Sequence, residues 1–180
     1  MKNSELAAFN RKRKIVQVCY VTDDCKKTIE YLYHILDLGP WKIFSFSNEN
    51  TSDIRLNGSP VTEPFQFRVA ICLLGDVQIE VIQPVYGPTI YDEFLKTHGR
   101  GIHHIKEKTP KPEVEAMLKK AERFGCKEAF FGYGFQGEED IDCFAYIDTY
   151  NALGAYYEFG NCPTIKPDQT QFSVWPEEEH

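Results

Sequence analysis

Two glutamates lie inside apolar runs at corresponding places of the chain, and they are the residues whose positions most clearly indicate chemistry. Glu80 stands between Ile79 and Val81, and Glu158 stands between two aromatic residues. A carboxylate inside an apolar strand costs several kcal/mol unless it is paired with a positive charge or bound to a metal. One cation that offsets both negative charges would explain why both glutamates are there.

Each half of the chain also carries a polar residue in its first apolar run. Gln17 lies a few residues before the helix-capping signal at 23–24, and His104 occupies the same place in the second half. With the two glutamates they form a donor set that suits one divalent ion, Co²⁺, Mn²⁺, Ni²⁺, Fe²⁺, Mg²⁺ or Zn²⁺, in an open octahedral site. The alternative places each glutamate on the wet face of a half-exposed strand, which explains one residue more easily than four in matched positions.

The first half of the sequence predicts a strand, an amphipathic helix and a further set of strands. The β-branched run 15–21 predicts the first strand, and the apolar spacing within 25–36 predicts the helix. The other strands are expected at 41–46, 65–74 and 77–83, with Pro84 ending the last one, and the polar loop 47–63 holds a short strand around 54–56.

The second half repeats this order. Its expected elements are a strand at 102–106, a helix at 112–123, an aromatic, glycine-rich stretch at 126–139, and strands at 142–148 and 155–159 around a turn. Such a repeat predicts an α+β fold of two tandem βαβββ modules. The predicted divisions are an N-terminal lead at 1–14, a first module at 15–84, a connector with a short helix at 85–101, a second module at 102–162 and a polar tail at 163–180.

The composition excludes several classes of protein. Hydrophobic residues make up 42% of the 180, enough for a core, and the net charge of −7 does not favour binding to nucleic acid. No apolar run reaches about 18 residues and the start of the chain lacks the apolar core of a signal peptide, so we expect a cytoplasmic protein without a membrane partner. The basic run 11–14 is either a solvated flank or a patch that steers phosphate or CoA. The six cysteines are expected to be small buried hydrophobic residues, not disulfides or zinc ligands.

Three strings of the sequence resemble the vicinal oxygen chelate superfamily, which includes glyoxalase I, methylmalonyl-CoA epimerase, extradiol dioxygenases and bleomycin-resistance proteins. GDVQIEVIQP followed by YDEFLKTHGRGIHHI resembles the epimerase passage in which a hairpin ends in a Glu or Gln ligand, a short helix follows and a GxHH strand brings the His ligand. GAYYEFGN resembles the closing strand, where the Glu is both ligand and base. The resemblance spans residues 15–160, is nearest to methylmalonyl-CoA epimerase, and implies curved mixed sheets that enclose a metal-binding cavity.

Carried over to this chain, the resemblance implies that Gln17, Glu80, His104 and Glu158 are the metal ligands and that Glu158 is also the catalytic base. It implies that the metal chelates two substrate oxygens, which polarises a carbonyl and stabilises an enolate. The substrate is then a small carbonyl compound or an acyl thioester, the reaction is of isomerase or lyase type, and a homodimer fits barrels of this kind. His103 is expected on the opposite face, where it packs or supports the ligand.

Two positions depart from the epimerase pattern at the reacting centre. The usual first-strand ligand is His, whereas this chain has Gln17, a neutral and weaker donor. Pro64 stands where the epimerases have a second acid, so the neighbouring Glu63 becomes the alternative second catalytic residue.

Two further residues are expected to bind substrate. Lys106 replaces a small residue two positions after His104 and shares its face by alternation, so it either contacts an anionic substrate or extends to solvent. Tyr156 shares the face of Glu158 and is expected to line the cavity. The aromatic stretch around 130–135 either shapes a pocket over the metal or packs as a loop.

Two other functions stay open on the sequence. An extradiol-type dioxygenase needs Fe²⁺ on two histidines and one carboxylate, and Gln17 in place of the first histidine disfavours it. A non-catalytic small-molecule binding protein of the bleomycin-resistance type commonly lacks the metal ligands, whereas three of the four expected here are typical of metal-binding members. Metal analysis of the purified protein separates the binding protein from the enzymes.

Overall fold

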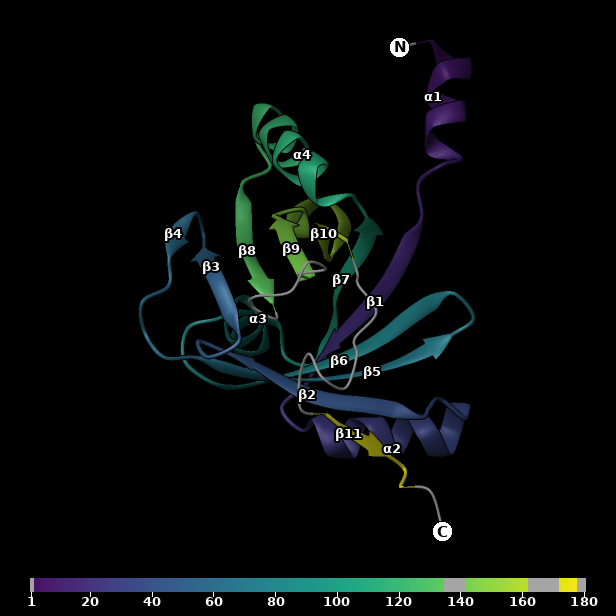
Figure 1. The fold of residues 1–180 in the computed structure, drawn as a ribbon, viewed down its shortest axis with the longest axis vertical. Helices are drawn as coiled ribbons and strands as arrows, with labels where there is room; N and C mark the ends of the chain where they lie inside the picture. Colours follow the sequence, from purple (N-terminus) through teal and green to yellow (C-terminus); the bar gives the residue numbers. More distant parts are fainter. Residues whose placement is uncertain (1, 135–141, 162–171, 178–180) are drawn as a thin grey trace.

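A single curved sheet forms the framework of the protein (Figure 1), in a computed structural model that describes residues 2–134, 142–161 and 172–177. At its centre, β1 (Ile15–Val21) runs antiparallel to β7 (Gly101–Lys108). Outward from β1 follow β6 (Val77–Tyr86), β5 (Gln66–Leu74) and β2 (Trp41–Ser47). Outward from β7 follow β10 (Tyr156–Gly160), β9 (Asp142–Ile147) and β8 (Glu128–Gly134). The two halves repeat one strand order about the central pair, which confirms the predicted α+β fold with curved mixed sheets.

Two helices cover the outer face of the sheet, one for each half (Figure 1). α2 (Cys25–Leu36) packs on β5 and β6 through Ile29, and Asp24 caps it by accepting a hydrogen bond from a backbone amide of the first turn. α4 (Lys111–Arg123) packs on β9 and β10 through Val114. The other helices are α1 (Asn3–Asn10), α3 (Ile90–His98) and α5 (Tyr150–Leu153). No helix of the described ranges is long and apolar enough to cross a membrane.

The sheet curls so that a short turn joins β2, near one end, to a strand near the other end. β3 (Thr51–Leu56) follows β2 in the sequence, yet it pairs with β8 at the opposite end of the sheet, and β4 (Ser59–Pro60) lies beyond it. β11 (Ser173–Trp175), from the predicted polar tail, pairs with β2. On the inner face the rings of Phe46 and Phe144, with centroids 6.1 Å apart, join a core of buried side chains from both halves. This inner core surrounds the predicted site.

Two local predictions need correction. Pro84 does not end β6: β1 pairs with β6 only as far as Ile82, so Pro84 lies where one edge of the strand has no neighbour and a missing amide hydrogen is tolerated. The aromatic stretch that starts at residue 126 is not a packed loop: it contains β8, the remaining strand of the predicted second βαβββ module, and Phe130 lies in the inner core. Residues 135–139 of that stretch lie outside the described part of the chain.

Candidate metal centre

One rung of the sheet places Gln17 and Glu158 on the inner face. Gln17 of β1 pairs with Gln78 of β6 and with Lys106 of β7, and Lys106 pairs in turn with Glu158 of β10. Residues that pair directly across neighbouring strands point to the same face of a sheet. The four side chains therefore lie in a row, and the Gln17 amide nitrogen donates a hydrogen bond of 3.0 Å to Gln78 Oε1.

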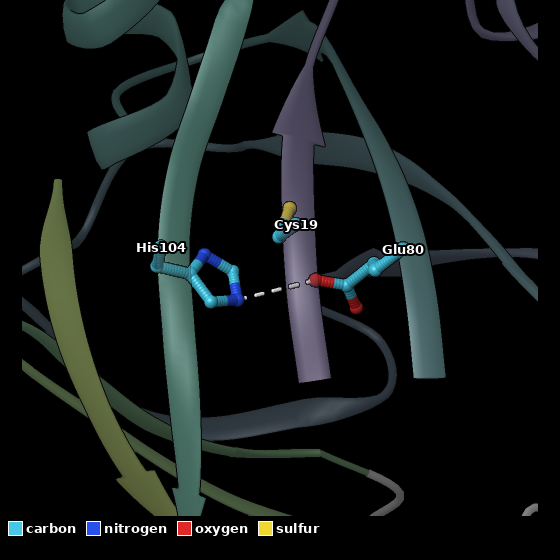
Figure 2. A group of neighbouring side chains, drawn as sticks. All are labelled: Cys19, Glu80 and His104. Carbon is cyan, nitrogen blue, oxygen red and sulfur yellow. Dashed lines mark ion pairs between the residues drawn. The ribbon is translucent and has the colours of Figure 1, made fainter. Parts of the chain in front are cut away.

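The adjacent rung brings Glu80 and His104 to the same face. Cys19, two residues after Gln17 on β1, pairs with Glu80 of β6 and with His104 of β7. Alternate residues of a strand share a face, so both rungs face the interior. Figure 2 shows Cys19, Glu80 and His104 extending from three adjacent strands toward one another.

Three of the predicted ligands converge on a nitrogen atom of the fourth. His104 Nε2 lies 2.9 Å from Glu158 Oε2, 3.3 Å from Glu80 Oε2 and 3.3 Å from Gln17 Oε1. All four side chains are buried, and the most exposed of them is Glu80 at 8%. Neighbouring ligands of an octahedral ion with bonds of about 2.1 Å lie roughly 3 Å apart. The spacing of these atoms therefore fits ligands around one ion, and their role as ligands stays a prediction.

One oxygen of this cluster lacks a hydrogen-bond donor. Glu158 Oε2 is fully buried, and the described residues offer it no hydrogen-bond partner although it lies 2.9 Å from His104 Nε2. Buried polar atoms nearly always have a partner, and a bound cation would satisfy this oxygen. Three oxygens and one imidazole nitrogen also form a donor set that divalent ions accept. The residues present therefore fit the metal that the sequence predicts.

A buried lysine belongs to the same cluster. Lys106 is 3% exposed, and its Nζ lies 2.9 Å from Glu158 Oε1. Gly160 makes room for it, because a Cβ there would lie 2.8 Å from Lys106 Cε and 2.0 Å from the carbonyl oxygen of Cys143. Strand alternation predicted this position of Lys106 on the face of His104. The alternative, a lysine that extends to solvent, is wrong.

The charges in the cluster oppose the effect of burial on its titratable groups. Burial by itself would raise the pKa of Glu158, but Lys106 and His104 outweigh it and leave that pKa below its ordinary value. Burial by itself would lower the pKa of His104, but the carboxylates of Glu158 and Glu80 outweigh it and leave that pKa above its ordinary value. Each group therefore favours the charged form of its neighbour.

Cys19 is a member of the site that the sequence did not reveal. Its sulfur, a carboxylate oxygen of Glu80 and a ring nitrogen of His104 all lie within 4.8 Å of one another (Figure 2). Burial, and then the Glu80 carboxylate, raise the pKa of the Cys19 thiol well above its ordinary value. The expectation that the cysteines are only small hydrophobic residues rested on the lack of a CxxC pair and on the apolar runs that surround Cys19, Cys72 and Cys143. The overlooked signal was the alternation from Gln17 to Cys19 on one strand.

A sequence profile of the glyoxalase/bleomycin resistance protein/dioxygenase superfamily matches residues 16–144. The chain belongs to this superfamily. The resemblance drawn from the three sequence strings is thereby confirmed. A comparison with curated proteins found no match.

Several solved structures share the fold of this superfamily member. A hypothetical protein from Bacillus halodurans is 18% identical, with a TM-score of 0.57 and coverage of 86% of this chain and 97% of that one. Methylmalonyl-CoA epimerase from Mycobacterium tuberculosis is 17% identical, with a TM-score of 0.52 and coverage of 81% and 85%. A mutant of 4-hydroxymandelate synthase from Streptomyces coelicolor is 15% identical, with a TM-score of 0.57 and coverage of 91% and 42%. At these identities the matches establish the fold.

The predicted orientation of His103 toward the opposite face is wrong, because a β-bulge in β7 of this superfamily member turns the side chain inward. Cys19 pairs with His104 and Tyr20 pairs with Ile102, so His103 is the additional residue of β7, and it is buried beside His104 on the inner side. The Nδ1 atoms of the two histidines lie 2.9 Å apart. Burial, and then His104, lower the pKa of His103 well below its ordinary value. A neutral His103 that accepts the Nδ1–H of His104 leaves His104 Nε2 free to face the three oxygens.

Two buried tyrosines lie beside the predicted ligands, and no sequence pattern pointed to them. Tyr146 of β9 pairs with Glu158, and its ring centroid lies 4.9 Å from that of His104. Its hydroxyl lies 2.9 Å from the hydroxyl of Tyr91 in α3. Burial raises the pKa of both phenols well above the ordinary value, so both stay protonated. One hydroxyl can donate its proton to the hydrogen bond between the two tyrosines. The proton of the other hydroxyl then stays available for a second hydrogen bond.

The remaining predicted site residues differ in position. Tyr156 lies next to the cluster, half-buried, with its ring centroid 4.9 Å from that of His103. Glu63 is exposed in the segment between β4 and β5, where its carbonyl oxygen accepts a hydrogen bond from Asn48. The described structure thus places Tyr156 at the site and Glu63 on the surface.

Proposed function

We propose that this chain is a metal-dependent isomerase or lyase of the glyoxalase type. Its substrate is a small carbonyl compound or an acyl thioester, and its reaction moves a proton on the carbon next to the carbonyl group. The observation that supports this best is the convergence of three buried oxygens, from Gln17, Glu80 and Glu158, within 3.3 Å of His104 Nε2. Membership of the superfamily supports the same class of chemistry.

The proposed ligands indicate which metal ions the site can hold and what the bound ion would supply. Gln17, Glu80, His104 and Glu158 hold one divalent ion, and their oxygen-rich donor set admits Mg²⁺, Mn²⁺, Fe²⁺, Co²⁺, Ni²⁺ or Zn²⁺. When bound, that ion supplies Lewis acidity toward the substrate carbonyl. With these four protein ligands, such an ion would still have room for the oxygens of a substrate.

Glu158 is the proposed base. Lys106 and His104 keep its pKa below the ordinary value although burial opposes them, so the carboxylate is ionised and can accept a proton. Lys106 holds Oε1 at 2.9 Å, whereas Oε2 lies among the ligands without a hydrogen-bond donor. Oε2 is therefore the oxygen available both to the ion and to the substrate proton. Glu63, which is exposed, stays a prediction as the second acid.

The substrate contacts are proposed from the groups that border the ligands. Lys106 places an ammonium group beside Glu158 and suits an anionic substrate, and Tyr156 adds an aromatic wall next to His103. A methylmalonyl-CoA epimerase with this fold has been solved in complex with methylmalonyl-CoA. An acyl-CoA thioester is therefore the first substrate to test, followed by the adduct of methylglyoxal and glutathione.

The test combines metal analysis with proton exchange. The full chain is reconstituted with each metal in turn, its metal content is measured, and the exchange of the substrate α-proton with deuterated solvent is followed by NMR. We expect one metal per chain and exchange on one of the two substrates. The Glu158→Gln variant should lose exchange while keeping its fold, and Glu113→Gln, an exposed glutamate of α4, is the matched control.

Three outcomes decide the proposal. Exchange that is lost in Glu158→Gln and kept in Glu113→Gln supports Glu158 as base. Exchange at the full rate in Glu158→Gln would show that another group moves the proton. A chain that takes up no stoichiometric metal and exchanges no proton would instead be a binding protein of the bleomycin-resistance type.

A further inference from the structure

Cys19 lies at the centre of the rung that carries two of the proposed ligands. It pairs with Glu80 on one side and His104 on the other, and it is fully buried. Its sulfur forms a group with a carboxylate oxygen of Glu80 and a ring nitrogen of His104, with no two of these atoms more than 4.8 Å apart. The thiol donates a hydrogen bond of 3.6 Å to the carbonyl oxygen of Tyr20, a weak contact that metal binding would replace.

The spacing of these atoms suits a thiolate-containing metal site. Around zinc, with bonds of about 2.3 Å to sulfur and about 2.0–2.2 Å to nitrogen and oxygen, tetrahedral ligand atoms lie roughly 3.3–3.6 Å apart. His104 Nε2 and Glu80 Oε2 are already 3.3 Å apart. The sulfur lies within 4.8 Å of donor atoms of both residues, and as a ligand it would move closer to them by a change of side-chain torsion.

The other buried cysteines show that Cys19 is not an ordinary core residue. Cys25 and Cys72 pack under α2, and Cys143 packs under α4, in each case within an apolar cluster on the outer face of the sheet. Among the residues described, Cys19 is the cysteine that groups with a carboxylate and an imidazole.

We propose that Cys19 is a ligand of the metal, so that the site selects zinc or cobalt over magnesium and manganese. The inference rests on the proposed function only in requiring that this site holds a metal. On binding, the thiol gives up its proton to solvent and the sulfur donates an electron pair to the ion. A soft thiolate favours Zn²⁺ and Co²⁺, whereas Mg²⁺ and Mn²⁺ prefer oxygen ligands.

Cobalt reports a thiolate ligand directly, because the sulfur–cobalt bond gives an intense charge-transfer absorption in the near ultraviolet. The full chain is titrated with Co²⁺, and both the bound cobalt and this absorption are measured. The wild type and the Cys25→Ser control should bind one cobalt and show the band. Cys19→Ser should lack the band and bind Zn²⁺ roughly 100-fold more weakly. Mutation of a residue that only supports a ligand already lowers metal affinity about 10–100-fold, and loss of a ligand should cost at least as much. Excess Mg²⁺ should not displace the cobalt from the wild type.

The measurement on the wild type decides the inference without relying on any variant. One bound cobalt without the band would overturn the assignment of Cys19 and leave the proposed function intact. A band that persists in Cys19→Ser and disappears in Cys25→Ser would also overturn it. No bound cobalt at all would overturn both the assignment and the proposed metal dependence.

Discussion

Replacing Lys106 by methionine tests the charge balance of the site. The pair between Lys106 Nζ and Glu158 Oε1 spans 2.9 Å, and the two side chains are only 4% and 1% exposed. Water therefore screens this pair little, and the usual discount for a surface ion pair does not apply. Removing one partner of a buried pair costs about 3–5 kcal/mol, because the other charge stays buried without compensation.

A bound metal changes that cost. A divalent ion next to Glu158 Oε2 supplies the positive charge that Lys106→Met removes, so we expect the variant to lose about 3–5 kcal/mol without metal and about 1–2 kcal/mol with it. By linkage, the variant then binds the metal more tightly than the wild type. A difference of about 2–3 kcal/mol corresponds to roughly 30–150-fold in affinity.

The assay is urea unfolding of both proteins, with a chelator and with saturating Zn²⁺, together with a direct titration of metal affinity. Lys108→Met is the matched control, because Lys108 lies on the same strand and is exposed. Lower pH should reduce the loss without metal, since Glu158 can then take a proton. An equal loss of stability with and without metal would refute the reasoning, because the ion would then not compensate Glu158.

Three further changes test the surroundings of the site. Gly160→Ala should cost about 1–3 kcal/mol in urea unfolding, because the new Cβ would lie 2.0 Å from a backbone oxygen; unchanged stability would contradict that packing. His103→Phe keeps an aromatic ring but loses the 2.9 Å contact to His104, so metal affinity should fall about 10–100-fold in a titration, and unchanged affinity would exclude a supporting role. Burial by itself would raise the pKa of Glu107, but Arg13 outweighs it and leaves that pKa below its ordinary value. The pair therefore stabilises the fold fully at a pH above the ordinary pKa of glutamate, and this stabilisation is lost as the pH falls through the folded-state pKa. Glu107→Gln should therefore cost about 1–2 kcal/mol at pH 7, given a partly exposed Arg13, and less as the pH falls through the folded-state pKa of Glu107; a loss independent of pH would contradict this.

The sequence predicted the parts of the fold that depend on local patterns. The helix α2 has the predicted bounds, because its apolar spacing and the cap at Asp24 are both local signals. The four predicted ligands lie together because two repeated modules place equivalent strand positions side by side. The symmetry between the halves was therefore enough to predict that four side chains form one cluster, those of Gln17, Glu80, His104 and Glu158.

The features that the sequence did not predict depend on pairing between strands. The inward position of His103 comes from a bulge, which appears only when the register of β7 against β1 is known. Cys19 enters the site because β1 lies between β6 and β7, so its neighbours come from distant parts of the chain. Period-two alternation gives the face of a residue, but it does not say which residues lie beside it.

The two unusual residues of the site act in the same direction. Lys106 lies in the rung of Gln17 and Glu158, so its charge repels a cation most strongly from that rung. Cys19 lies in the other rung, between Glu80 and His104, and offers a soft donor there. In the proposed site, repulsion by Lys106 and attraction by Cys19 both move the ion toward the second rung. Lys106→Met should therefore weaken the sulfur–cobalt absorption while it strengthens cobalt binding. An absorption of unchanged intensity in that variant would show that the two residues act independently.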